Sequence, residues 1–124
     1  MCIRDSPVPG RDIFVQAWYQ GGISIMDFTD SANPKEIGYF DRGPINKDML
    51  ITGGYWSAYF YKGYVYGTEI IRGLDVFKLV PSEYLSEDEI SLASEAFPES
   101  GPEVFNPQQQ VPLVWPNNSA DASL

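Results

Sequence analysis

The most regular stretch of the chain runs from Trp56 to Val80, where short apolar runs alternate with glycine turns. The runs are rich in aromatic and β-branched residues, which suit a pleated surface, and glycine supplies the positive φ of a tight turn. The pattern predicts an antiparallel meander with strands at 57–61, 64–69 and 74–80. Apolar side chains fall on both faces of the last two strands, which favours a sheet packed between two neighbours.

The segment before this meander has the same organisation. We predict three further strands, at 12–19, 23–28 and 35–41. Asp30–Pro34 offers turn-capping side chains followed by a proline ring that blocks continued pairing, so the strand after it is expected to be an outer one. Arg42–Gly54 contains glycine and proline breakers and is predicted to be a loop that crosses to the second group of strands.

An internal repeat emerges when the first group of strands is laid over the second with an offset of 51 positions. Gly22-Ile23-Ser24-Ile25-Met26 falls on Gly73-Leu74-Asp75-Val76-Phe77, Phe14-Val15 falls on Val65-Tyr66, and Phe28 falls on Leu79. Periods of about 40–50 residues with several strands are typical of propeller blades, which bury their faces by stacking on neighbours. The alternative is that any two strand–glycine–strand hairpins look alike.

The β pattern ends at Pro81. Ser86-Glu87-Asp88-Glu89 has the form of a capping box, and acids are favoured at a helix N-terminus. An apolar stripe of Ile90, Ala93 and Phe97 follows, so we predict a short helix over 87–96 that Pro98 ends.

The tail from Glu99 is rich in Pro, Gln and Asn, which predicts an extended or loose chain. Large apolar residues within 103–116 predict that part of this tail lies along the domain. Asn117-Asn118-Ser119 fits a glycosylation acceptor, a short pattern that also arises by chance.

The length, charge and residue composition exclude several functional classes for this chain. The length of 124 residues predicts one domain, and no apolar run approaches the roughly 20 residues of a membrane span. A net charge of −9 argues against nucleic acid as a partner, since phosphate binding depends on Lys and Arg, and it favours solubility. The chain has no histidine, which excludes a His-based triad or His metal site within it. Its single cysteine, Cys2, cannot form an intrachain disulfide.

Residues 1–6, Met-Cys-Ile-Arg-Asp-Ser, do not match the rest of the chain and resemble a translated adapter sequence found in metagenomic reading frames. We interpret them as a non-native leader, with natural sequence from about Pro7. The remainder is expected to divide into 7–80, with partial blades at 12–41 and 56–80, and 81–124, with the helix and the extension.

Ile23-Ser24-Ile25-Met26-Asp27, which follows a glycine turn, resembles the repeat of the LVIVD-repeat proteins. Phe28–Pro34 continues that pattern, with Ser31 where proline is usual, and Gly73–Leu79 resembles a closing repeat, with Lys78 where aspartate is usual. The resemblance covers nearly all of 13–116, including the C-terminal extension with Asn106-Pro107-Gln108. It implies a truncated β-propeller of about two blades, exported or on the cell surface, whose upstream blades belong to the same protein. We expect two partial sheets of about three strands each, packed face to face.

Three groups of side chains are candidates for a binding role. Asp27, Asp30 and Asn33 carry oxygens that suit a cation such as Ca²⁺, but they lack the ligand density of a calcium loop, so we favour turn capping. The second group consists of aromatic residues that could form a ligand-binding surface, and we favour packing between blades as their role. Its members are Trp18, Tyr19, Tyr55, Trp56, Tyr59 and Tyr61. The third consists of Glu69, Arg72 and Asp75 around a glycine turn. These residues could face a propeller channel or pair with one another, and we favour a structural or solvated role for them.

Other polar residues fit no catalytic arrangement. Glu87, Asp88, Glu89 and Glu95 are predicted to form a solvated helix face. Ser24 lacks the spacing of a nucleophile elbow. The sequence therefore predicts no catalytic residue, metal site or cofactor. We expect a non-catalytic, extracellular or cell-surface module that binds a protein or glycan. The alternative is a fragment of a propeller hydrolase or metal-dependent lactonase.

Overall fold

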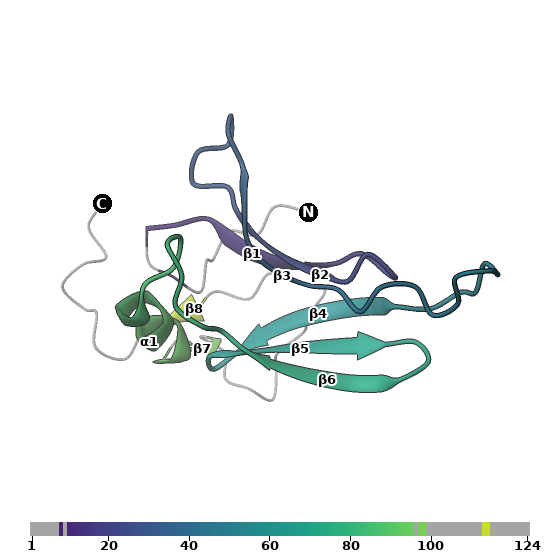
Figure 1. Ribbon diagram of the computed structural model, residues 1–124. Helices are drawn as coiled ribbons and strands as arrows, with labels where there is room; N and C mark the ends of the chain where they lie inside the picture. The colour runs from purple at the N-terminus through teal and green to yellow at the C-terminus, as the bar shows by residue number, and fades with distance from the viewer. Residues whose placement is uncertain (1–7, 9, 96, 99–112, 115–124) are drawn as a thin grey trace.

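The computed structural model describes residues 8, 10–95, 97–98 and 113–114. Within them the chain forms two three-stranded antiparallel sheets, one short helix and one two-residue pairing (Figure 1). The elements are β1 Ile13–Ala17, β2 Ile23–Asp27, β3 Lys35–Phe40, β4 Tyr55–Tyr61, β5 Tyr64–Glu69, β6 Gly73–Lys78, α1 Glu87–Glu95, β7 Phe97–Pro98 and β8 Leu113–Val114. We call β1-β2-β3 the first sheet and β4-β5-β6 the second sheet.

The predicted fold class is confirmed. The protein is mainly β, each sheet is a meander of sequential strands, and the two sheets are separate, consistent with propeller-like blades. β3 lies at an edge of its sheet, as expected of an outer strand. β4 begins at Tyr55, two residues before its predicted start. Tyr55 pairs with Glu69 of β5. It also forms a bridge to Tyr19, just after β1: the Tyr55 amide donates to the Tyr19 carbonyl at 2.8 Å, and the Tyr19 amide donates to the Tyr55 carbonyl at 3.1 Å.

The two sheets form two layers that share one core (Figure 1). Its fully enclosed residues are Ile23, Tyr55 and Val65, each 2–3% exposed. The inner face of the first sheet adds Val15, Ala17, Ile25 and Phe40, and the inner face of the second sheet adds Ala58, Phe60, Phe77 and Leu79. The rings of Phe40 and Phe77 lie 4.6 Å apart between their centroids, so the layers are in direct aromatic contact.

The 51-residue repeat identifies which face of each sheet lies in the shared core. An offset of 51 positions carries the inner-face residues Val15, Ile23 and Ile25 onto Tyr66, Leu74 and Val76. These lie on the outer face of the second sheet, because their neighbours Val65 and Phe77 point into the shared core and side chains alternate along a strand. The sheets therefore pack with unlike faces together, as successive blades of a propeller do.

Two glycines allow close approaches of the backbone, Gly54 between the two layers and Gly22 within the first sheet. Gly54 has φ +90°, and a Cβ there would lie 2.0 Å from the Tyr19 carbonyl carbon of the other sheet. Gly22 has φ +85°, and a Cβ there would lie 2.0 Å from the carbonyl oxygen of Phe40. Both positions combine a left-handed backbone with close approach of another chain segment, which only glycine allows.

The helix α1 lies at one end of the two layers, and the 42–54 loop extends beyond the opposite end (Figure 1). The capping box of the helix is confirmed: the Glu89 carboxylate accepts from the Ser86 amide at 2.8 Å, and the Ser86 hydroxyl accepts from the Glu89 amide at 3.2 Å. Ala93 is fully buried against Val8, Ile13 and Leu85. This second cluster seals the helix end of the layers.

The chain after the helix differs from the prediction. Helix α1 ends at Glu95, and Phe97 and Pro98 form β7 instead of closing the helix. β7 pairs with Leu113–Val114 of the tail. The predicted leader at 1–6, the remaining tail and the acceptor pattern at Asn117 lie outside the described residues.

Candidate functional site

The turns at the end of the layers opposite α1 bring together one polar group of side chains. We call Arg42, Tyr55, Glu69, Arg72 and Asp75 the turn-end cluster. They line or adjoin a small recess between the turn after β1, the loop after β3 and the turn after β5. Glu69, Arg72 and Asp75 are the candidates that the sequence placed around the last of these turns, whereas Arg42 and the hydroxyl of Tyr55 join them from distant positions.

Glu69 is buried, with 5% of its surface exposed. Its carboxylate accepts hydrogen bonds from the backbone amides of Gly54 at 2.7 Å and Ile71 at 3.0 Å, and from that of Arg72. Burial alone would raise the pKa of Glu69, but these amide donors outweigh it and hold the pKa below its usual value. Glu69 is therefore an ionised group whose acceptor positions serve the turn and the start of β4.

Asp75 links the two sheets. It accepts from the Tyr55 hydroxyl at 2.6 Å and from the Arg42 guanidinium at 2.7 Å, and Arg42 also lies 5.5 Å from the centroid of the Phe40 ring. The bond from Tyr55 and the nearby Arg42 lower the pKa of Asp75, whereas burial and the same bond raise the pKa of Tyr55. Both groups keep their protonation state near neutral pH, which does not suit proton transfer.

The predicted pairing within the turn is therefore only partly right. Asp75 pairs with Arg42 of the loop after β3, and not with its sequence neighbour Arg72. The charge of Arg72 still acts on Glu69 and Asp75 and favours their ionised forms. The cluster serves mainly to order the loops where the two sheets meet.

The oxygens of Asp27, Asp30 and Asn33 do not converge on a common point. Asp30 accepts from the Ala32 amide at 3.1 Å and from the Asn33 side-chain amide at 2.9 Å, which confirms turn capping. Asp27 also caps a turn, because it accepts from the Thr29 amide at 2.9 Å, and it pairs with Arg11 as well. Within the part of the chain that the structure describes, no group of three or more Asp, Glu, His or Cys residues could hold a metal ion.

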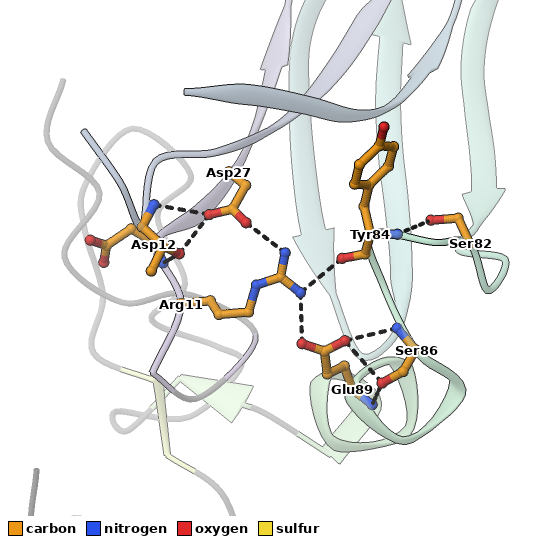
Figure 2. Close-up of polar contacts among 8 residues, drawn as sticks. Arg11, Asp12, Asp27, Ser82, Tyr84, Ser86 and Glu89 are labelled. Carbon is orange, nitrogen blue, oxygen red and sulfur yellow. Dashed lines mark hydrogen bonds and ion pairs between the residues drawn. The ribbon is translucent and has the colours of Figure 1, made fainter. Parts of the chain in front are cut away.

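Arg11 forms a second polar centre, at the helix end (Figure 2). Its guanidinium donates to Asp27 at 2.6 Å, to Glu89 at 2.6 Å and to the Tyr84 carbonyl at 2.9 Å. The prediction of a solvated acidic helix face is wrong for Glu89, which is half-buried and shared between Arg11 and the capping box, while Glu87, Asp88 and Glu95 are exposed. Arg11 ties the first sheet to the helix.

The aromatic candidates separate into three environments. Tyr55 packs between the layers against Phe40 and Phe77, as predicted for packing between blades. Tyr19 and Trp56 form an exposed edge-to-face pair with centroids 5.9 Å apart, and Trp18 is also exposed. Tyr59 and Tyr61 lie half-buried on the outer face of the second sheet, beside Tyr66 and Tyr64 of β5. Among these candidates, the pair of Tyr19 and Trp56 is the exposed part that spans both layers.

Ser24 is buried and donates to the Glu36 carboxylate, so its hydroxyl has a structural partner.

A shallow recess of about 240 Å³ lies between α1 and the end of the second sheet where β5 begins. It is lined by Lys62, Gly63, Tyr64, Lys78, Glu87, Ile90, Ser91 and Ser94. Its polar groups have no arrangement that we associate with a reaction.

Sequence reasoning missed Arg11, Arg42 and the tyrosines of β5 as members of these groups. An arginine has no local signal for a partner 73 to 78 positions away, which is the separation of Arg11 from Tyr84 and Glu89. The tyrosines had a signal, because their alternation with Val65 placed them on one face of a predicted strand.

Comparison of the chain with protein-family models, curated proteins and solved structures finds no significant match. Among the described residues, no helix has the length and apolar character needed to cross a membrane.

Proposed function

We propose that this chain is part of a non-catalytic β-propeller of the LVIVD-repeat type, exported or displayed at the cell surface, which binds a protein or glycan. The observation that carries this proposal is the stacking of two repeat-related sheets through unlike faces. A repeat of this kind builds a surface and leaves function to side chains at the ends and edges of the blades.

The polar groups favour a binding role over a catalytic one. The acids of the turn-end cluster are held by backbone amides, a tyrosine and an arginine, and their lowered pKa values keep them ionised. A general acid or base works best with a pKa near the operating pH. Neither Glu69 nor Asp75 meets this requirement.

The exposed aromatic pair offers the binding surface. Tyr19 is 53% and Trp56 is 66% exposed, and they lie where β1 and β4 meet. Large aromatic side chains supply much contact area at a low cost in conformational entropy, and they are enriched in interfaces. We assign ligand contact to this pair.

Two measurements test the proposal. Binding to a panel of glycans and surface proteins is compared for the wild type, Trp56→Ala and the control Tyr84→Ala, whose site lies near the opposite end of the layers. We expect binding by the wild type and the control, and loss of at least tenfold in affinity for Trp56→Ala. Equal binding by all three would refute the assignment.

Calcium titration separates this function from the alternative of a propeller hydrolase or metal-dependent lactonase. Calorimetry with Ca²⁺ is expected to show no stoichiometric binding in the wild type or in Asp75→Asn. Tight one-to-one binding that Asp75→Asn or Glu69→Gln removes would favour the metal-dependent enzyme and contradict a non-catalytic module.

A further inference from the structure

The outer face of the second sheet carries a continuous apolar surface. Leu74 is 62% exposed and Val76 is 52% exposed, and Tyr64 and Tyr66 lie beside them on β5. Tyr59 and Tyr61 extend the surface onto β4. Contiguous exposed apolar surface on a sheet marks an interaction site or an aggregation hazard.

The repeat identifies what this face is built to contact. Its residues Tyr66, Leu74 and Val76 are equivalent to Val15, Ile23 and Ile25, which pack on the inner face of the second sheet. That inner face contains Val65, Gly67 and Phe77. The same offset makes these equivalent to Phe14, Gln16 and Met26, which lie on the outer face of the first sheet.

We propose that chains of this protein stack head to tail, with the outer face of the second sheet of one copy on the outer face of the first sheet of the next. The contact reproduces, between copies, the contact that already joins the two sheets within each copy. It rests on the propeller-type stacking proposed above, goes beyond the ligand binding and uses different residues, and it makes further copies of this chain, in place of upstream blades, the neighbours of the two outer faces. Because the two faces differ, the contact is heterologous and leaves a free face at each end, so it builds rings or open stacks.

The contact between copies is looser than the contact within one. Gly67 lets the Ile23 methyl group approach so closely that a Cβ on Gly67 would lie 2.6 Å from it. Its equivalent on the outer face of the first sheet is Gln16, whose side chain fills that space. The net charge of −9 on each copy also opposes stacking. Added salt screens this repulsion, so we expect association to increase with ionic strength.

Sedimentation velocity of paired variants tests the stacking. The head variant is Leu74→Lys with Val76→Lys, and the tail variant is Gln16→Lys with Tyr39→Lys, since Tyr39 lies on the outer face of the first sheet and is 77% exposed. Leu50→Lys, at a loop residue that is 97% exposed, is the control. Thermal unfolding of each variant verifies that it is folded.

We expect the wild type and the control to associate as concentration and salt increase. Each paired variant alone is expected to stay monomeric, and an equal mixture of the two is expected to form a one-to-one dimer, because each still has one intact face. A monomeric wild type at its solubility limit in high salt would overturn the proposal. Self-association of the tail variant alone would also overturn it, because a like-face contact would then be responsible.

Discussion

The first and second sheets carry equivalent strands in opposite surroundings. Val15, Ile23 and Ile25 of the first sheet are packed into the core, whereas their equivalents Tyr66, Leu74 and Val76 face outward. The difference does not come from residue type, because all six side chains are apolar or aromatic. It comes from position in the stack: the first sheet has a neighbouring sheet on this side, and among the described residues the second does not.

Equivalent strands of the two sheets therefore have similar apolar residues, whether or not a neighbouring sheet covers them. The apolar pattern of a strand indicates which of its faces can pack against another sheet, and not whether that sheet is present. The second sheet has the two-faced apolar pattern of a strand with neighbours on both sides. One neighbour is present, and the proposed stacking would supply the other. Such a surface also predicts poor solubility for the isolated chain.

A side chain added where the two sheets approach most closely should lower the free energy of unfolding more than any other change considered below. Gly54→Ala would force a Cβ to within 2.0 Å of the Tyr19 carbonyl carbon and would strain a backbone with φ +90°. We expect a loss of about 4 kcal/mol or more in the free energy of unfolding. Urea denaturation, followed by circular dichroism, measures it.

Gly43→Ala is the matched control, because Gly43 has φ +73° and a Cβ there would meet nothing within 4 Å. It isolates the cost of the left-handed backbone, which is about 1–2 kcal/mol. Equal losses for the two variants would mean that the sheets do not approach each other at Gly54.

The same substitution, valine to alanine, can be made on both faces of the second sheet and its effect on stability compared. Val65 is 2% exposed in the shared core, and Val76 is 52% exposed on the outer face. Val65→Ala should cost about 2–3 kcal/mol in the free energy of unfolding of the dilute monomer, from lost burial and the cavity left behind. Val76→Ala should cost less than about 0.5 kcal/mol under the same conditions. Similar losses at both sites would contradict the assignment of inner and outer faces.

The attachment of the first sheet to the helix depends on Arg11. Arg11→Met keeps the apolar stem and removes the donors to Asp27, Glu89 and the Tyr84 carbonyl. We expect a loss of about 2 kcal/mol in the free energy of unfolding, because half-buried acceptors lose a charged donor. Lys47→Met, on an exposed loop residue, should change it by less than about 0.5 kcal/mol. Hydrogen exchange should show the amides of α1 opening first in Arg11→Met, and unchanged protection there would count against this role.

A smaller effect concerns the pH dependence of the free energy of unfolding, which should differ between equivalent positions at the ends of the two sheets. Asp27 in the first sheet corresponds to the exposed Lys78 in the second. Burial would raise the pKa of Asp27, but bonds from Arg11 and Thr29 outweigh it and lower the pKa. A lowered folded-state pKa means that the stabilisation is present above the unfolded value, near 4, and is lost as pH falls through the folded value.

We therefore expect Asp27→Asn to reduce the free energy of unfolding by about 1 kcal/mol at pH 7, and the deficit to shrink as pH falls below about 4. Lys78→Asn should show almost no change at either pH. A deficit for Asp27→Asn that grows towards low pH would have the wrong sign and would contradict the ion pair with Arg11.

Local features of the fold could be predicted from the sequence because they depend on neighbouring residues. Alternation and glycine turns located the six main strands, and Ser86 with Glu89 located the helix start. The partners of Asp75 and Glu89 could not be predicted, because Arg42 and Arg11 reach them only after the layers have packed. Aromatic residues were predicted as a group, yet only packing separates the enclosed Tyr55 from the exposed Trp56.

The stacking of unlike faces is the central claim, and a proton–proton NOE experiment tests it directly. The Ile23 δ1 methyl group lies against Gly67 and the Tyr55 ring in the structure. A protein labelled at Ile and Met methyl groups should therefore show NOEs from the Ile23 δ1 methyl to the Gly67 α protons. NOEs to Gly67 from the Met26 methyl, with none from Ile23, would place the other face of the first sheet in the core and contradict the account.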